Sequence, residues 1–235
     1  MGERLAVAVV GVGYLGRFHA LIYARHPGVD LVGVVDTDPE VARRVAEEAG
    51  CKACTDVGEL PDGLDAVSIV VPTTAHLAVT EPFLQQGVHV LLEKPIAATV
   101  EEGMRIVAAA ERAGVVLQIG HLERFNAGVM ALAERISNPR FIEAHRMSPF
   151  VARATDVDVI SDLMIHDIDI VLSLIDADIT HISAAGTAVL TDHLDIANAR
   201  IEFSNGAVAN VIASRVSREK LRRIRVFEHH RYQSL

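Results

Sequence analysis

The chain has 235 residues, 50% hydrophobic and 23% charged, a composition typical of a folded globular protein rather than a disordered one. Its formal net charge of −9 argues against general electrostatic affinity for nucleic acid or anionic membranes. The sequence contains no apolar run of about 18 residues and lacks the N-terminal pattern of a secretory signal. We therefore expect a cytoplasmic protein with neither nucleic-acid nor membrane partners.

The N-terminal region carries a dinucleotide-binding pattern. An apolar run over Leu5–Val10 leads into a G-x-G-x-x-G motif, and helical spacing follows. The motif glycines are Gly11, Gly13 and Gly16. Such glycines let the backbone turn and approach a pyrophosphate at a helix N-terminus. The motif alone is weak, but Asp36 ends a second apolar run, Val29–Val35, where a carboxylate accepts hydrogen bonds from ribose hydroxyls. Asp36 favours NAD over NADP, because a carboxylate repels a 2′-phosphate.

Strands and helices alternate up to about residue 119. Further strands are predicted over residues 51–54, 64–71, 88–92 and 115–119, and helices over 15–25, 39–49, 76–86 and from residue 99. Asp38 is the expected N-cap of the second helix and Thr99 that of the fourth. Strands that are apolar on both faces and separated by helices predict a doubly wound parallel sheet.

Cys51 and Cys54 form a C-x-x-C pair within the short third strand. A redox or zinc site would need a helix N-terminus beneath the first cysteine or a second ligand pair. The sequence shows neither, so we interpret both residues as inert structural thiols.

The pattern changes after Gly120. Helices are predicted over residues 123–136 and 159–175, and strands over 141–147, 179–190, 195–203, 207–214 and 224–228. The Asn205-Gly206 pair marks a hairpin turn between two of these strands. The chain therefore divides into an α/β Rossmann-like domain, residues 1–120, and an α+β domain with a mostly antiparallel open sheet, residues 121–235.

Lys94 is the first candidate catalytic residue. It lies in Glu93-Lys94-Pro95, directly after a strand, and ligands of open α/β sheets bind outside the carboxyl ends of the strands. There its ammonium could stabilise an alkoxide or share its proton. A solvated lysine in a proline-terminated loop is the alternative, and position alone does not decide between them.

Asp162, His166 and Asp169 share one face of the predicted long helix. An imidazole with a carboxylate one turn away is a natural general base near neutral pH. Asp167 lies on another face and is expected to be structural. No cysteine or further spaced histidine joins the group, so we do not predict a metal site.

These motifs together resemble one known family. Gly11-Val-Gly-Tyr-Leu-Gly16, Pro72-Thr-Thr-Ala-His76, Glu93-Lys-Pro95 and Asp162-x-x-x-His166-x-x-Asp169 occur in this order. Over roughly residues 4 to 215 the chain is similar to the glucose–fructose oxidoreductase / inositol dehydrogenase / rhizopine catabolism (Gfo/Idh/MocA) family of NAD(P)-dependent oxidoreductases. The resemblance implies that Lys94, His166 and Asp162 are catalytic. It implies cofactor-binding roles for Gly11, Gly13, Tyr14, Leu15, Gly16, Asp36, Pro72, Thr73, Thr74, His76, Glu93 and Lys94. Substrate contacts are implied for His121, Arg124, Asn126, Asp162 and His166. The corresponding Lys–Pro bond is often cis in the family, and the sequence does not decide whether Lys94-Pro95 is.

The function implied is hydride transfer between NAD and a ring secondary alcohol of a sugar, sugar nucleotide or polyol. A UDP-N-acetylhexosamine 3-dehydrogenase is one candidate. The second domain would bind substrate and form a homo-dimer or homo-tetramer through its sheet. A non-catalytic NAD-binding regulator or partner-binding protein with the same fold is the alternative.

The chain departs from the family pattern in two places and carries one basic cluster. Met164 stands where many family members have a glycine, so it is expected to narrow the site. The chain ends in or just after a strand-like run where family members continue, so we expect the second sheet to be C-terminally incomplete. The basic residues Arg215, Arg218, Lys220, Arg222 and Arg223 either meet a diphosphate or protect a strand edge.

Overall fold

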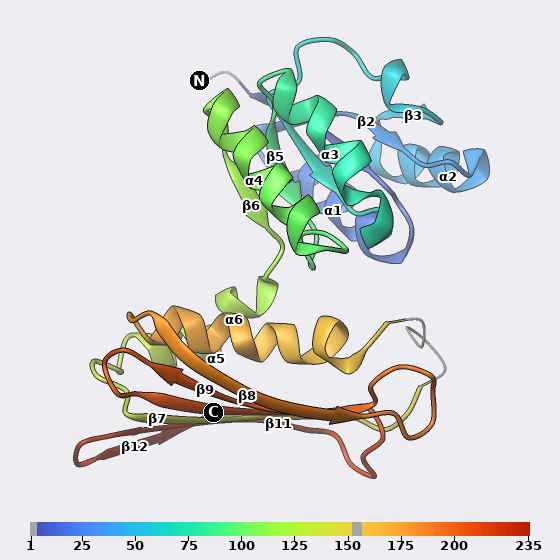
Figure 1. Cartoon of the computed structure of the whole chain (residues 1–235). Helices are drawn as coiled ribbons and strands as arrows, with labels where there is room; N and C mark the ends of the chain where they lie inside the picture. The colour runs from blue at the N-terminus through green and yellow to red at the C-terminus, as the bar shows by residue number, and fades with distance from the viewer. Residues whose placement is uncertain (1–3, 152–156) are drawn as a thin grey trace. The chain divides into compact units, whose positions relative to one another are not determined.

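The computed structural model describes residues 4–151 and 157–235. It divides into two compact units, Met1–Gly120 and His121–Leu235 (Figure 1). Each unit has its own buried apolar core. Loop residues 152–156, which lie within the second predicted domain, fall outside the described residues.

The first unit is built on a six-stranded parallel sheet in the order β3-β2-β1-β4-β5-β6. Its strands are β1 (Leu5–Val10), β2 (Val29–Val35), β3 (Lys52–Cys54), β4 (Ala66–Ile69), β5 (His89–Leu92) and β6 (Leu117–Ile119). The strand order reverses between β1 and β4, which is where open α/β sheets bind ligands at their carboxyl ends. The doubly wound parallel sheet predicted from the sequence is confirmed.

Four helices connect these strands. They are α1 (Tyr14–Arg25), α2 (Pro39–Ala49), α3 (His76–Gln85) and α4 (Val100–Ala113). The side chain of Asp38 accepts hydrogen bonds from two backbone N–H groups at the start of α2, and Thr99 accepts one at the start of α4. Both predicted caps are thereby confirmed. Gly50 and Gly114 end the same two helices in the left-handed conformation.

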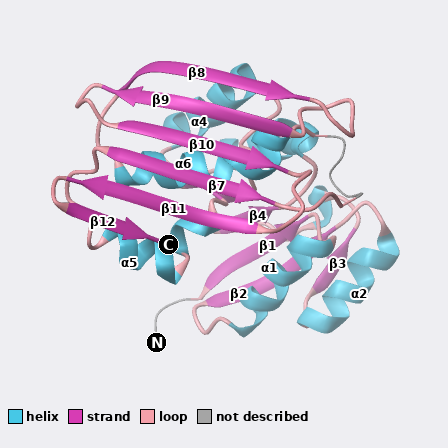
Figure 2. Ribbon diagram, turned by 90° about the horizontal axis from the view of Figure 1, so that it is seen from below, coloured by secondary structure: helices cyan, strands magenta, loops and turns pink. Residues whose placement is uncertain are grey.

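The second unit is a six-stranded mixed sheet in the order β12-β11-β7-β10-β9-β8 (Figure 2). Its strands are β7 (Phe141–Met147), β8 (Ile179–Thr187), β9 (Ile196–Phe203), β10 (Val208–Ser214), β11 (Leu221–Glu228) and β12 (Arg231–Ser234). Among the described strand pairs of this sheet, only β7 and β10 run parallel. Helices cover one face (Figure 1), and the core between them and the sheet includes Ile142, Ile170 and Val211. The predicted α+β domain is confirmed.

Two predicted helices differ from the structure. The segment expected to be helical over residues 123–136 is a 3-10 turn, Leu122–Phe125, followed by α5, Ala127–Ala133. The break occurs at Asn126, whose side chain accepts the Gly128 N–H at 2.9 Å and starts α5. The long helix begins as a π-helical turn, Ile160–Met164, and continues as α6, Ile165–Leu174.

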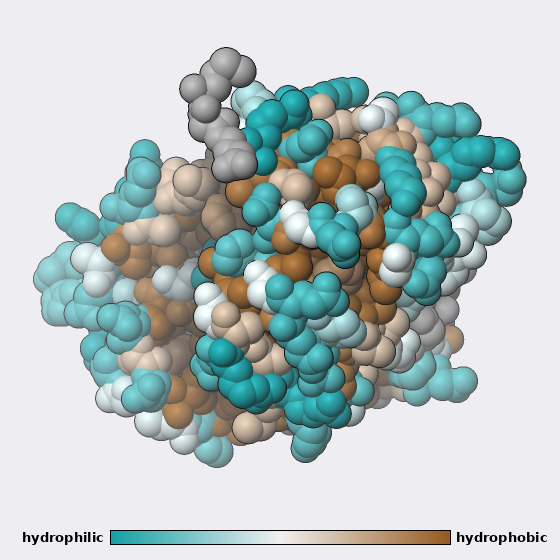
Figure 3. Space-filling view, turned by 90° about the horizontal axis from the view of Figure 1, so that it is seen from above, coloured by the Kyte–Doolittle hydropathy of each residue, from teal (hydrophilic) through white to brown (hydrophobic). Residues whose placement is uncertain are grey.

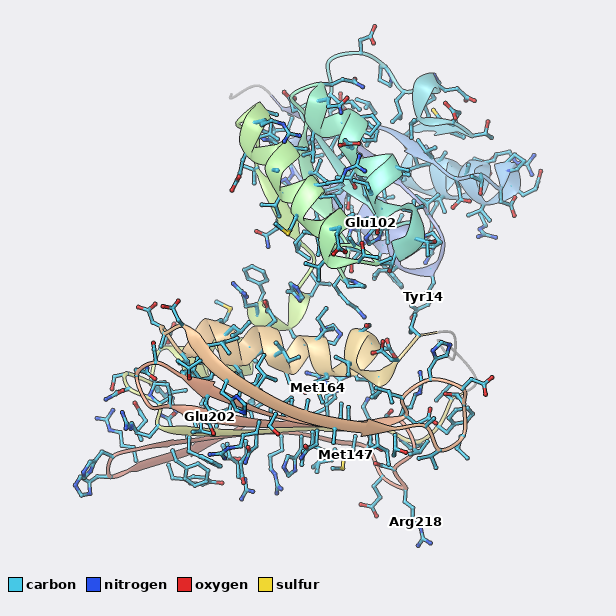
Figure 4. The ribbon with its side chains drawn as sticks, viewed as in Figure 1. Tyr14, Glu102, Met147, Met164, Glu202 and Arg218 are labelled. Atoms are coloured by element: carbon cyan, nitrogen blue, oxygen red, sulfur yellow. The ribbon has the colours of Figure 1, made fainter. Side chains whose placement is uncertain are left out.

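The expected role of Met164 is wrong. Its side chain is 2% exposed and belongs to the core of the second unit. Figure 4 places it between its helix and the sheet. Because this face of the helix packs on the sheet, Met164 fills the core and does not narrow a site.

The surface carries both polar and apolar side chains. On the face seen in Figure 3, hydrophobic side chains are interspersed with hydrophilic ones. Met104 and Val100 on α4 are among the large apolar residues that are exposed. Within the described part of the chain, no helix has the length and hydrophobicity needed to cross a bilayer.

Candidate functional site

The glycine turn between β1 and α1 has the shape of a pyrophosphate cradle. Gly11 has φ +82°, and a Cβ there would lie 2.6 Å from the Val70 carbonyl oxygen. A Cβ on Gly16 would lie 1.8 Å from the Gly11 carbonyl oxygen, so both positions require glycine. A Cβ on Gly13 would meet nothing within 4 Å, so its glycine keeps open the space in front of the helix N-terminus. This arrangement fits an anion approaching the backbone N–H groups of α1.

Asp36 is fixed at the end of β2 by two backbone groups. Its Oδ2 accepts the Val12 N–H at 2.9 Å and its Oδ1 accepts the Asp38 N–H at 3.1 Å. A carboxylate has about four acceptor sites, so each oxygen retains capacity for a ribose hydroxyl. The observed geometry therefore fits the predicted role of Asp36.

A cavity of about 600 Å³ lies beside this turn. Its lining includes the glycine turn, Asp36 and Pro72, which the sequence singles out. It also includes Thr55, Asp56 and Val57, which sequence reasoning missed. These three residues directly follow β3, the strand next to β2. Their position after the carboxyl end of a parallel strand was the sequence feature that could have identified them. The cavity thus combines ends of several parallel strands, as a dinucleotide site requires.

Tyr14 and Leu15 are exposed at the start of α1, and Tyr14 is labelled in Figure 4. The Pro72 turn continues as a 3-10 segment, Thr73–Ala75, into α3. Pro72 and Ala75 line the cavity. His76, by contrast, is 1% exposed, so its imidazole lies inside the unit. His76 could therefore affect a cofactor only indirectly, by positioning the backbone carbonyl groups of Val71 and Ile96 that its ring contacts.

Lys94 directly follows β5 at the carboxyl edge of the parallel sheet and is half-buried. The Lys94-Pro95 bond is cis. Glu93 is 6% exposed, and burial raises the pKa of its carboxyl group. Its Oε1 lies 3.5 Å from Nε2 of His19, a buried histidine on α1 whose pKa is lowered by burial. Sequence reasoning missed His19, which carries no local signal beyond following the glycine motif.

In the second unit, Asp162 lies in the π-helical turn and His166 in the first turn of α6. Both side chains are half-buried. Single π-helical turns inside helices occur frequently at functional sites. The structure thus places the two predicted catalytic residues of this unit on adjoining turns of one helical segment.

Asp169, the third member of the predicted helix face, has a separate partner. It is 8% exposed and receives two hydrogen bonds from Arg124, at 2.9 and 2.5 Å. Arg124 therefore joins the turn that follows β6 to α6. Together with the Asn126 cap, this pairing gives two of the predicted substrate contacts a structural role. His121 precedes the same turn and is half-buried.

A second ion pair lies beneath this turn. Asp167 accepts hydrogen bonds from Arg146 at 2.9 and 2.8 Å, and both side chains are buried. Glu123 contacts Arg146 at 3.2 Å and Arg222 at 3.1 Å. The expected structural role of Asp167 agrees with this network.

The basic residues between positions 215 and 223 do not share one environment. Arg215 is buried and donates to Asp195 Oδ1 at 2.7 Å and to the Val157 carbonyl oxygen at 2.7 Å. It is neither a diphosphate contact nor part of a solvated strand edge, since its charge is neutralised inside the unit. Arg218 is exposed and projects away from the sheet (Figure 4).

The two cysteines are free thiols. Burial raises the pKa of Cys51 to about 11 and also raises the pKa of Cys54. Both groups therefore stay protonated near neutral pH, which agrees with inert thiols. No group of side chains suited to holding a metal ion occurs among residues 4–151 and 157–235.

Comparison with known families matches both units. Residues 5–121 match an oxidoreductase family with an NAD-binding Rossmann fold. Residues 130–229 match the GFO/IDH/MocA C-terminal domain.

Individual relatives have named activities. The chain is 44% identical over 232 residues to UDP-N-acetylglucosamine 3-dehydrogenase from Acidithiobacillus ferrooxidans, covering 98% of this chain and 74% of that protein. A solved structure of that enzyme matches with a TM-score of 0.93 over 100% of this chain and 74% of that chain. The NAD-dependent scyllo-inositol 2-dehydrogenase of Bacillus subtilis is 30% identical over 237 residues, covering 92% of this chain and 69% of that protein.

Proposed function

This chain belongs to the Gfo/Idh/MocA family of NAD-dependent oxidoreductases, and on that premise we propose that it oxidises a ring hydroxyl of a UDP-linked N-acetylhexosamine. The observation that carries the choice of substrate is the 44% identity to UDP-N-acetylglucosamine 3-dehydrogenase over almost the whole chain. Inositols are the second substrate class, favoured by the 30% identity to scyllo-inositol 2-dehydrogenase.

The first unit supplies the cofactor site. The open space at Gly13 suits the pyrophosphate, and the fixed carboxylate of Asp36 suits the ribose hydroxyls. NAD, when bound, accepts the hydride released from the substrate carbon. The side chains of the protein would orient the alcohol and accept its hydroxyl proton.

We assign these catalytic roles to Lys94, His166 and Asp162. His166 would take the hydroxyl proton while Asp162, one turn earlier, orients the imidazole. Lys94 would stabilise the negative charge that develops on the oxygen. The substrate C–H bond would break with its electron pair passing as hydride to bound NAD, the O–H proton would pass to His166, and the alcohol would become a ketone.

The experiment is a rate measurement with NAD and UDP-N-acetylglucosamine, compared with scyllo-inositol. Lys94→Ala and His166→Ala should each lower kcat by about 10²–10⁴-fold. His181→Ala removes an imidazole from an exposed strand position and should leave the rate unchanged. Equal rates in all three variants would refute the assignment. A clear preference for scyllo-inositol would refute the substrate class.

We also propose a homo-oligomer formed through the second sheet. On the strand face opposite the core residues, Phe141, Phe227 and Tyr232 form a run of ring contacts, with centroids 6.0 and 5.1 Å apart. A second copy would remove these rings from water. Cytoplasmic residence is likewise a proposal. Light scattering on the purified chain tests the assembly, and a monomeric mass would refute it.

A further inference from the structure

The short segment Glu93–Ile96, which carries Lys94, has a buried histidine at each end. His19 lies on α1 and is 9% exposed. His76 opens α3 and is 1% exposed. Burying an imidazole is costly unless its nitrogens find partners, so the partners indicate what each ring does.

His19 faces the start of the segment. Its Nδ1 lies 2.7 Å from the hydroxyl of Ser68 on β4, and its Nε2 lies 3.5 Å from Oε1 of Glu93. The other oxygen of Glu93 accepts the backbone N–H of Lys94 at 3.3 Å. A continuous chain of polar contacts thus runs from α1 through Glu93 to the lysine.

Gly120 leaves room for this carboxylate. A Cβ at position 120 would lie 2.5 Å from Oε1 of Glu93, closer than real Cβ contacts come. The end of β6 is therefore shaped around the side chain of Glu93. Because the obstructing atom is the end of a flexible side chain, an alanine at 120 would displace the carboxylate rather than the strand.

His76 faces the other end of the segment. Its Nε2 lies 3.0 Å from the carbonyl oxygen of Val71, at the end of β4, and its Nδ1 lies 3.3 Å from the carbonyl oxygen of Ile96. A neutral imidazole carries one N–H and donates to one of the two carbonyls at a time, whereas a protonated ring donates to both. In each case the ring contacts both the residue after the cis proline and the turn that lines the cofactor cavity.

We propose that His19 and His76 are positioning residues for Lys94, holding its segment at both ends and thereby fixing where its ammonium group lies. Neither histidine needs to touch substrate or cofactor for this role. The inference rests on the proposed function in taking Lys94 as the residue that acts on the alcohol oxygen.

The test compares His19→Gln and His76→Gln with a matched control, His26→Gln. His26 is exposed and lies between α1 and β2, at the opposite edge of the sheet from Lys94. Hydrogen–deuterium exchange of the Glu93, Lys94 and Ile96 amides should accelerate about tenfold in the two test variants. Their kcat should fall by about 10²-fold, since small displacements of a reacting group have effects of that size. Their KM and NADH affinity should stay near the wild-type values, and the control should match wild type throughout.

Gly120→Ala tests the same contact chain without removing a histidine. Displacing the Glu93 carboxylate should reproduce the exchange and kcat effects of His19→Gln. Unchanged exchange over residues 93–96 in the folded variants would overturn the proposal, as would equal losses in kcat and NADH affinity. Absence of turnover in the wild-type chain would count against the proposed function alone, because the exchange measurement needs no substrate.

Discussion

The carboxylate of Asp36 accepts a hydrogen bond from the backbone N–H of Val12 at 2.9 Å, which ties the end of β2 to the glycine turn. Two features read separately in the sequence, the turn and the acidic residue, are therefore one structural unit. A cofactor entering the cavity meets a carboxylate whose position is already set, so little reorganisation is needed on binding.

Replacing Asp36 should change cofactor choice. Asp36→Ser removes the charged acceptor of the ribose hydroxyls, and a hydrogen bond to a charged group is worth about 1.5–3 kcal/mol. We expect NAD affinity to fall by about 10–100-fold while NADP affinity rises relative to it. Asp30→Ser, an exposed position on the same strand, is the control. Calorimetric titration with both cofactors measures the ratio, and an unchanged ratio would contradict the assignment.

Replacing Glu93 should alter how stability depends on pH. Burial raises the pKa of Glu93 above its ordinary value of 4.5, so the folded state holds its proton more tightly than the unfolded state. The stability this group contributes is full below pH 4.5 and is lost as the pH rises through the folded-state pKa. Glu93→Gln cannot ionise, so it should gain stability relative to wild type as the pH rises. Urea unfolding at several pH values tests this, with exposed Glu111→Gln as control; a constant difference would refute it.

The Arg146–Asp167 pair should be costly to break. Both side chains are buried and joined by two hydrogen bonds, so Asp167→Asn leaves a buried guanidinium short of its counter-charge. Breaking such pairs costs about 3–5 kcal/mol, and Glu123 should keep the loss near the lower end. Denaturant unfolding should show this loss in Asp167→Asn and none in exposed Asp176→Asn. Equal stability of the two variants would contradict the account.

Asp195 should support stability towards acid. Burial by itself raises its pKa, but the backbone N–H groups of residues 189–191 and the Arg215 guanidinium outweigh burial and hold the pKa well below 3.8. The contribution is therefore present above pH 3.8 and is lost as the pH falls towards the folded-state pKa. Asp195→Asn should lower the thermal midpoint at neutral pH and flatten its decline in acid. Asp192→Asn, at an exposed neighbouring position, should show neither effect.

Local signals account for most of what the sequence predicted. The Asp38 and Thr99 caps, the glycine turn and the strand pattern depend on neighbouring residues, and the structure has them as expected. Side-chain pairings between residues far apart in the chain produce no local sequence pattern from which they could be predicted. The sequence placed Asp169 on a reactive helix face and Arg215 in a basic cluster, yet each pairs with a residue distant in the chain. The His19–Glu93 contact was missed for the same reason.

The break at Asn126 shows a different limit. Helical spacing over residues 123–136 predicted one helix, but a side chain that caps a helix start competes with continuation of the preceding turn. Likewise, apolar periodicity does not distinguish a π-helical turn from an α-helical one, so the start of the segment carrying Asp162 was not predictable.

The most direct test of the account follows the hydride itself. UDP-N-acetylglucosamine carrying deuterium at ring carbon 3 is incubated with NAD and the chain, and the reduced cofactor is analysed by mass spectrometry. We predict reduced cofactor that carries the deuterium, formed at similar rates by wild type and His181→Ala and about 10²–10⁴-fold more slowly by His166→Ala. Reduced cofactor without the label would contradict hydride transfer from that carbon to NAD. So would the absence of any reduced cofactor after incubation with wild type.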